Sequence, residues 1–408
     1  MKINLHKFFF EIYSFLFIFV MINREFLLFG LDLRYILLVL SVILLFLYGT
    51  SKNKNITIQN GKKNNNTIYI FLYLLLLWSL FSNISWLWNG LDRFFLQTLN
   101  HCILIANNLL AIIIFKKFQN YIDEYKLKKY VLFSCIVLVT SFVFVGMGYS
   151  LSQISGSDSR AISKTIVGSI EHKNLYGGDF RLAGYAEDAN YASLFLTVGL
   201  ITSIQTKCKK SIKALLCLIF TIAFGFSCSK TMLISFIIGL IYIFSYDAFK
   251  RKNIHNIINV LFIFIIIVSI IILPNLSLFS SKVTMSTRFK MWNLARDLFF
   301  KSPLIGNGLS SFKSYINSIY NGWYVQPHST YWQLLSETGL IGFLIFIFLM
   351  IKCLNNDTLT KCNRYLLFIF FIFIINFETV QLQIFVYIIY ILSIIDKKNV
   401  NGNMDRSG

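Results

Sequence analysis

Four cations and one histidine in the polar stretches of this sequence could handle a phosphate-bearing substrate. Arginine presents a rigid fork of N–H donors and stays charged, so it pairs with phosphate through two hydrogen bonds. Arg181, Arg288 and Arg296 are candidates of this kind, with Lys230 as a point charge. His328 can accept a proton near neutral pH, as an attacking hydroxyl requires. These residue types suit a group transfer in which a phosphate-bearing group leaves.

The same positions also have structural explanations, and the sequence leaves both open. Arg288 and Arg296 share one face of an expected helix, where they suit ordinary lipid headgroups as well as a lipid diphosphate. Asp188 and Asn190 suit a substrate contact or a helix cap. Lys230, in a tight turn at 227–231, suits a headgroup anchor or a further diphosphate contact.

His328 begins a stretch that runs into an apolar helix, and its alternative is a structural hydrogen bond at the membrane interface. Glu337 follows nine residues later, which at about 100° per residue puts it on the opposite helix face. We therefore place Glu337 among the substrate-binding residues, with Asp188 and Asn190, rather than as a partner of the imidazole. Gly339 and Gly342, three residues apart, predict close helix packing.

The elements that must position these residues are membrane helices. The chain has 408 residues, of which 56% are hydrophobic and 14% charged, with a mean hydropathy of +0.65. Apolar runs near the ~20 residues that cross a bilayer, without the alternation of barrel strands, predict an all-α polytopic bundle of about twelve helices in a single domain, 1–408. We expect spans at 7–22, 34–49, 67–88, 95–115, 130–149, 188–205, 212–227, 230–247, 255–273, 331–351, 363–377 and 380–395.

Two loops, 150–187 and 274–330, are longer than ordinary connections in helical membrane proteins. In the second, positions 288, 292, 295, 296 and 299 recur on one face of an amphipathic helix that we expect at the membrane surface. Pro303, Gly306 and Gly308 break that helix, and a second short helix is expected at 309–321. This loop carries the candidate site.

Charge and cysteine patterns limit the function classes. The formal net charge is +20, but Lys and Arg concentrate in alternate loops, which places both termini in the cytoplasm and the two long loops outside. The excess of basic residues is therefore explained by the orientation of the chain in the membrane, and we expect no nucleic-acid partner. The 7 cysteines lie in spans or on the cytoplasmic side without a CxxC pair, so neither disulfides nor a zinc site are expected. The first span lacks a small-residue cleavage site and predicts a retained helix.

Taken in order, these segments resemble the O-antigen ligase and O-antigen polymerase superfamily, integral-membrane enzymes that act on undecaprenyl-diphosphate-linked glycans. The resemblance covers about 180–345 in motif. It departs from the family at Lys230, where arginine is usual, and at Ser329, where asparagine is frequent. The matching elements are Arg181-x-x-Gly184-x-x-x-Asp188-x-Asn190, Ser227-x-Ser229-Lys230, Thr287-Arg288-x-x-x-Trp292-x-x-Ala295, Pro303-Leu-Ile-Gly306-x-Gly308, His328-Ser329 and Glu337-x-Gly339-x-x-Gly342.

The resemblance implies that Arg181 and Arg288 hold the donor diphosphate while His328 works beside the transferred sugar. It implies a multi-pass protein of the bacterial inner (cytoplasmic) membrane whose site faces outward. Its partners would be the undecaprenyl-diphosphate-linked donor and acceptor, membrane lipid, a flippase and a chain-length regulator. No acidic cluster with ligand spacing accompanies Arg288 or His328, so we expect an inverting transfer with no cofactor and no metal.

Three functions stay open on this basis. We favour polymerisation of repeat units into O-antigen or capsule, with ligation of glycan onto lipid A core as the alternative that shares the donor chemistry. A lipid-linked oligosaccharide transporter is the non-enzyme alternative, although transporters tend to have paired repeats and ionisable groups at the bilayer midplane. Here the candidate charges gather at one interface.

Overall fold

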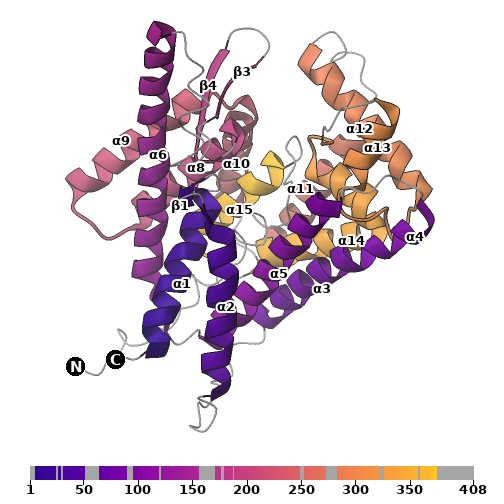
Figure 1. Cartoon of the computed structure of the whole chain (residues 1–408), viewed down its shortest axis with the longest axis horizontal. Helices are drawn as coiled ribbons and strands as arrows, with labels where there is room; N and C mark the ends of the chain where they lie inside the picture. Colours follow the sequence, from indigo (N-terminus) through magenta and orange to yellow (C-terminus); the bar gives the residue numbers. More distant parts are fainter. Residues whose placement is uncertain are drawn as a thin grey trace. The chain divides into compact units, whose positions relative to one another are not determined.

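The computed structural model is built almost entirely of helices, which confirms the all-α membrane class (Figure 1). It describes residues 5–23, 26–28, 31–50, 64–89, 95–118, 121–155, 171–175, 179–186, 188–248, 252–272, 283–320, 326–356 and 359–374. Within these residues 4 helical segments are long and apolar enough to cross a membrane: Leu5–Ile22, Thr67–Trp88, Lys210–Ser227 and Thr330–Leu354.

Each expected span from 7–22 to 363–377 overlaps a described helix, and the span expected at 380–395 lies outside the described residues. The helices, in chain order, are α1 (Leu5–Ile22), α2 (Leu33–Thr50), α3 (Asn64–Phe81), η1 (Ser82–Ser85), α4 (Trp86–Asn89), α5 (Phe95–Lys117), α6 (Glu124–Ser155), α8 (Ala189–Gln205), α9 (Lys210–Ser227), α10 (Lys230–Ala248), α11 (Lys252–Ile272), α12 (Val283–Lys301), α13 (Ser311–Ile319), α14 (Thr330–Leu354) and α15 (Lys361–Phe373).

Two short antiparallel hairpins join the helices, and the sequence did not predict them. One pairs β1 (Leu27–Leu28) with β2 (Leu31–Asp32). The other pairs β3 (Glu171–Leu175) with β4 (Asp179–Gly184) and lies in the first long loop. The strands are too short to alter the fold class.

The chain divides into two compact units, which we describe separately. The first comprises Met1–Ile58 and Leu110–Ile234. In it α1 packs against α2 and α6, while α8 packs against α6 and α9 (Figure 1). Phe10, Tyr13 and Phe17 of α1 enclose the ring of Phe115, with centroids 5.5–5.9 Å away. That a single integral-membrane domain spans 1–408 stays a prediction.

The second unit comprises Gln59–Leu109 and Ser235–Gly408, and α14 is its central helix. α14 packs against α3, α11, α12, α13 and α15. Beside it, the rings of Tyr242 and Phe368 stack with centroids 3.8 Å apart. The two described helices of the second long loop, α12 and α13, therefore both pack against one helix, α14.

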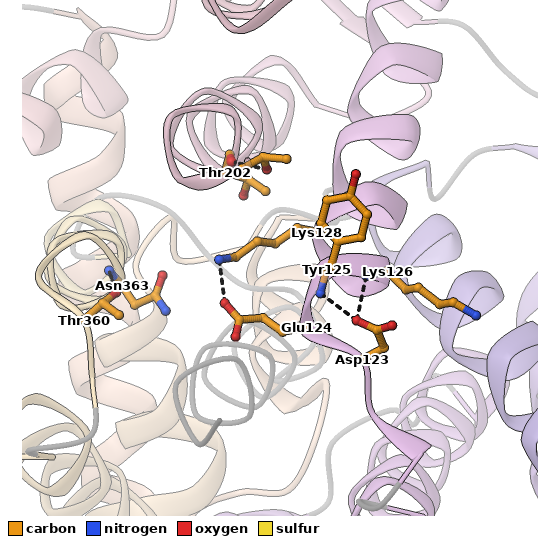
Figure 2. Close-up of polar contacts among 9 residues, drawn as sticks. Asp123, Glu124, Tyr125, Lys126, Lys128, Thr202, Thr360 and Asn363 are labelled. Atoms are coloured by element: carbon orange, nitrogen blue, oxygen red, sulfur yellow. Dashed lines mark hydrogen bonds and ion pairs between the residues drawn. The ribbon is translucent and has the colours of Figure 1, made fainter. Parts of the chain in front are cut away.

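Polar side chains fix where several helices begin. Asp123 accepts hydrogen bonds from the amides of Tyr125 and Lys126 at 3.0 and 3.4 Å, and one turn of α6 is closed by the Glu124–Lys128 ion pair at 2.6 Å (Figure 2). A side-chain oxygen at this position satisfies amides that a helix start leaves without partners. Thr360 caps α15 in the same way through the amide of residue 363.

Candidate functional site

The arginine-bearing helix of the second long loop forms as expected. α12 buries Trp292 and presents Arg288 half-buried on the same side. Arg296 lies two turns further along, about half exposed, with its Nε 3.8 Å from the carboxylate of Asp297. Phe300 is exposed at the end of the helix, as in helices that lie in the headgroup region. Both arginines are therefore partly buried.

Lysine and tyrosine side chains connect α12 with the second short helix, α13, which forms at the expected place. Lys290 lies 4.7 Å from the ring centre of Tyr320, and Lys301 lies 4.3 Å from that of Tyr315. Burial raises the pKa of Tyr315, and the nearby Asp297 carboxylate adds to the shift. The phenol therefore stays protonated, and its ring acts as a neutral partner for the ammonium group.

The turn between these helices is inserted into a break in α14. Gly339 has φ +68° and ψ −172°, which interrupts the helix. The carbonyl of Pro303 accepts the amide of Leu340 at 2.8 Å, and the amide of Gly308 binds the carbonyl of Glu337 at 2.9 Å. Backbone outside regular helix is tolerated at membrane depth where protein satisfies its hydrogen bonds. Gly339 does allow a close approach, as expected, but to the backbone of the inserted turn rather than to another helix, and it also supplies the positive φ.

Asn307 is a residue whose role the sequence analysis missed. Its buried amide Nδ2 donates to the carbonyl of Leu298 on α12 at 2.8 Å and to that of Ser336 on α14 at 2.9 Å. One side chain therefore ties α12, the turn and α14 together. The only signal in the sequence was an amide placed between two glycines in a turn.

His328 lies where the sequence put it, immediately before α14. It is half-buried, with a φ of +53° that turns the chain sharply into the helix. Ser329 is the N-cap residue, and the amide of Thr330 binds the carbonyl of Ile374 at 3.1 Å. Left-handed backbone at a residue other than glycine is uncommon and must be held by its surroundings.

Glu337 is buried within α14 rather than exposed to a cleft. Its Oε2 accepts a hydrogen bond from Gln333 Nε2 at 3.3 Å. The backbone amides of Ser310 and Phe312, at the start of α13, and the Lys313 side chain lie near the same carboxyl. Its role as a substrate contact stays a prediction.

Of the candidates in the first unit, two have structural partners. Asp188 caps α8 by accepting the amide of Asn190 at 2.7 Å. The side-chain oxygen of Asn190 accepts from Ser229 at 2.8 Å, which fixes the turn between α9 and α10. Lys230 begins α10 and is exposed. Arg181 lies in β4, and its side chain is outside the described part of the structure.

Residues 215–347 match the protein-family model described as O-antigen ligase. This segment contains the turn after α9, α12, the inserted turn and the first two-thirds of α14. The match supports membership of this segment in the O-antigen ligase and polymerase superfamily. No curated protein and no solved structure matches the chain.

The match supports a role of the O-antigen ligase or polymerase type, and the long apolar helices support a multi-pass membrane protein. The matched segment includes Lys230, Arg288, Arg296, His328 and Glu337, and ends before α14 does. The candidates at 181, 188 and 190 precede it. The superfamily assignment is thus carried by the unit built around α14 and the turn that precedes it.

Metal ligands were not expected, and the described residues hold no group of three or more His, Cys, Asp or Glu that could bind a metal ion. That the reaction needs no metal stays a prediction, because parts of the long loops lie outside this description. Among the described residues of the unit built around α14, the two arginines predicted to bind phosphate, Arg288 and Arg296, lie on α12.

Proposed function

We propose that this protein polymerises undecaprenyl-diphosphate-linked repeat units into a surface polysaccharide on the outer side of the cytoplasmic membrane. One observation carries the proposal. Arg288 on α12, the inserted turn and His328 immediately before α14 all belong to one compact unit and to the segment that matches the O-antigen ligase family. A cation for phosphate and a base for a hydroxyl are the two groups that such a transfer needs.

In this mechanism an acceptor hydroxyl oxygen attacks the anomeric carbon of the donor sugar. The bond between that carbon and the diphosphate oxygen breaks, and its electron pair leaves with the undecaprenyl diphosphate. The guanidinium of Arg288 stabilises the negative charge that grows on the leaving group. The imidazole of His328 takes the hydroxyl proton. Attack opposite the leaving group inverts the anomeric configuration.

Ligation onto lipid A core is the second candidate, favoured by the description of the matching family. Both reactions use the same donor chemistry and differ in the acceptor. Deleting the gene and resolving the surface glycan by gel separates them, because a lost polymerase leaves one repeat unit on the core and a lost ligase leaves bare core. Transport without transfer would leave purified protein unable to lengthen the glycan.

The proposal is tested with purified protein in liposomes containing the lipid-linked repeat unit. Arg288→Ala, Arg288→Lys and His328→Ala should each lower polymer formation by roughly a hundredfold or more, as loss of a charge-stabilising or proton-accepting group does. Lysine should not replace Arg288, since it lacks the bidentate fork. Lys290→Ala, two residues along α12 and exposed, is the matched control and should stay active. Full activity of Arg288→Ala would overturn the assignment.

A further inference from the structure

A row of buried polar side chains follows one side of α14. Ser329, Gln333 and Glu337 are spaced by four residues and are 0%, 7% and 3% exposed. At 3.6 residues per turn, this spacing puts the three on one stripe, about 6 Å apart along the axis. The row starts at the residue that directly follows His328. It runs along the same half of α14 that receives the inserted turn.

The row offers hydrogen-bond acceptors that the protein leaves unused. The amide Nε2 of Gln333 donates a hydrogen bond to Glu337 Oε2. The side-chain oxygen Oε1 of Gln333 is left to accept a hydrogen bond from another group. Among the residues that the structure describes, Ser329 Oγ, Gln333 Oε1 and Glu337 Oε1 make no hydrogen bond of normal geometry. Buried polar atoms without partners destabilise a fold and are rare in proteins, so a set of three on one stripe calls for a functional explanation.

Neighbouring positions extend the same pattern. Within the described part of the chain, Ser311 Oγ at the start of α13 and both side-chain polar atoms of Gln326 also lack partners. Both residues are buried. α13 packs against α14, so the serine belongs to the wall that covers the helix. These buried polar atoms without hydrogen-bond partners therefore lie around the first half of α14.

The hydrogen-bonding groups of the row determine which class of ligand would be complementary to it. Carbonyl and carboxyl oxygens accept hydrogen bonds, so the complementary ligand carries many O–H donors. A diphosphate offers only acceptors, so it has no donor for these oxygens. A neutral saccharide presents hydroxyls at the required density. The donor diphosphate and the acceptor sugar thus call for opposite surroundings, which Arg288 and the row on α14 provide.

We propose that Ser329, Gln333 and Glu337 bind hydroxyl groups of the acceptor saccharide and hold its end beside His328. This inference rests on the proposed function. It assigns a binding position to the acceptor saccharide, which is one of the two substrates. Ser329 adjoins the proposed base in the chain, so a hydroxyl bound there lies next to the group that takes its proton. Gln333 and Glu337 bind the sugar further into the unit.

The test uses an acceptor that cannot act as a donor. The oligosaccharide repeat unit, released from its lipid by mild acid, keeps its hydroxyls but has lost the diphosphate. Labelled lipid-linked glycan is held constant in liposomes while the free oligosaccharide is varied. Ser329→Ala and Gln333→Met should each raise the KM for the oligosaccharide about five- to tenfold, the value of one or two hydrogen bonds. The KM for the donor should stay unchanged.

If the row has only a structural role, the result differs. Removing a buried hydroxyl that has no hydrogen-bond partner would then stabilise the folded protein and leave its affinity for the oligosaccharide unchanged. An unchanged oligosaccharide KM in Ser329→Ala, with an equal or higher melting temperature, would overturn the inference. Ser336→Ala is the matched control, since that buried hydroxyl already donates to the carbonyl of Gln333 at 3.1 Å. Its oligosaccharide KM should equal that of the wild type. If Gln333→Met does not fold, Ser329→Ala decides alone.

Failure of this inference is distinguishable from failure of the proposed function. A wild-type protein that transfers no glycan in liposomes refutes the function. An active wild type whose Ser329→Ala and Gln333→Met variants keep the wild-type oligosaccharide KM refutes only the acceptor assignment. Binding of the free oligosaccharide, followed by the fluorescence of nearby Trp332, adds a readout that does not depend on turnover. The two substitutions should weaken that binding by the same factor.

Discussion

Gly306 and Gly339 meet backbone to backbone in the unit built around α14. A Cβ on Gly306 would collide with the backbone of Glu337 and Gly339, and a Cβ on Gly339 would collide with that of Leu304 and Gly306. Both glycines have a positive φ, +86° and +68°. The broken helix and the inserted turn therefore require each other.

Replacing either glycine by alanine should destabilise the protein by roughly 2–4 kcal/mol, because a left-handed backbone and a steric clash add together. The melting temperature of the purified protein, followed by tryptophan fluorescence, measures the effect. Gly225→Ala in α9 is the control, since a Cβ there meets nothing within 4 Å. That substitution should be neutral or stabilising by up to about 1 kcal/mol, the difference in helix propensity.

The membrane helices could be predicted from the sequence because hydrocarbon leaves the backbone few alternatives. A long apolar run must satisfy its own hydrogen bonds, so its position alone fixes a helix. The break between α12 and α13 could also be predicted from local sequence, because Pro303 and Gly306 have strong conformational preferences of their own. The cap at Asp188 is of the same kind and is present in the structure, while a contact of Asp188 with substrate stays a prediction.

The break in α14 could not be predicted, because the pattern at Gly339 and Gly342 suits two different causes. Two glycines three residues apart in an apolar helix indicate close packing, and Gly342 does pack closely against Trp78. Gly339 instead serves a segment more than thirty residues earlier. The buried row on α14 was missed for a related reason, since Gln333 is recognisable only once its burial and its partner at Glu337 are known.

The hydrogen bond between Ser229 and Asn190 should stabilise the turn between α9 and α10. Ser229→Ala removes the donor to the side-chain oxygen of Asn190 and should cost about 1 kcal/mol, the value of one buried hydrogen bond. A double-mutant cycle with Asn190→Ala isolates the contact and should give a coupling energy of about 0.5–1.5 kcal/mol. Simple additivity of the two substitutions would contradict the contact.

Arg181 should contribute to activity beyond the positive charge of its hairpin. Lys173 is its partner in the register of β3 and β4, which makes it a matched control of the same sign and location. Arg181→Ala should lower polymer formation about ten- to a hundredfold, as loss of a charged hydrogen bond to phosphate does. Lys173→Ala should remain within about twofold of the wild type. Equal losses for both would indicate a general electrostatic effect of the hairpin.

The ion pair between Lys126 and Glu11 should give the stability a specific dependence on pH. The hydrogen bond that Lys126 Nζ donates to the Glu11 carboxylate, 2.6 Å long, raises the pKa of Lys126 above that of an ordinary lysine. The pair therefore stabilises the folded protein fully below the unfolded lysine pKa of about 10.4, and this contribution is lost as the pH rises through the higher folded value. Because Lys126 is largely exposed, the contribution is small.

The measurement compares the melting temperatures of the wild type and Glu11→Gln as a function of pH. The difference should be constant between about pH 6 and 9, where the lysine is charged in both the folded and unfolded states, and should shrink above about pH 10.5. In a Lys126→Met background, Glu11→Gln should show no alkaline change, because the titrating partner is gone. A difference that instead disappeared as the pH fell from 9 to 6 would contradict Lys126 as the source of the linkage, because a lysine stays charged throughout that range.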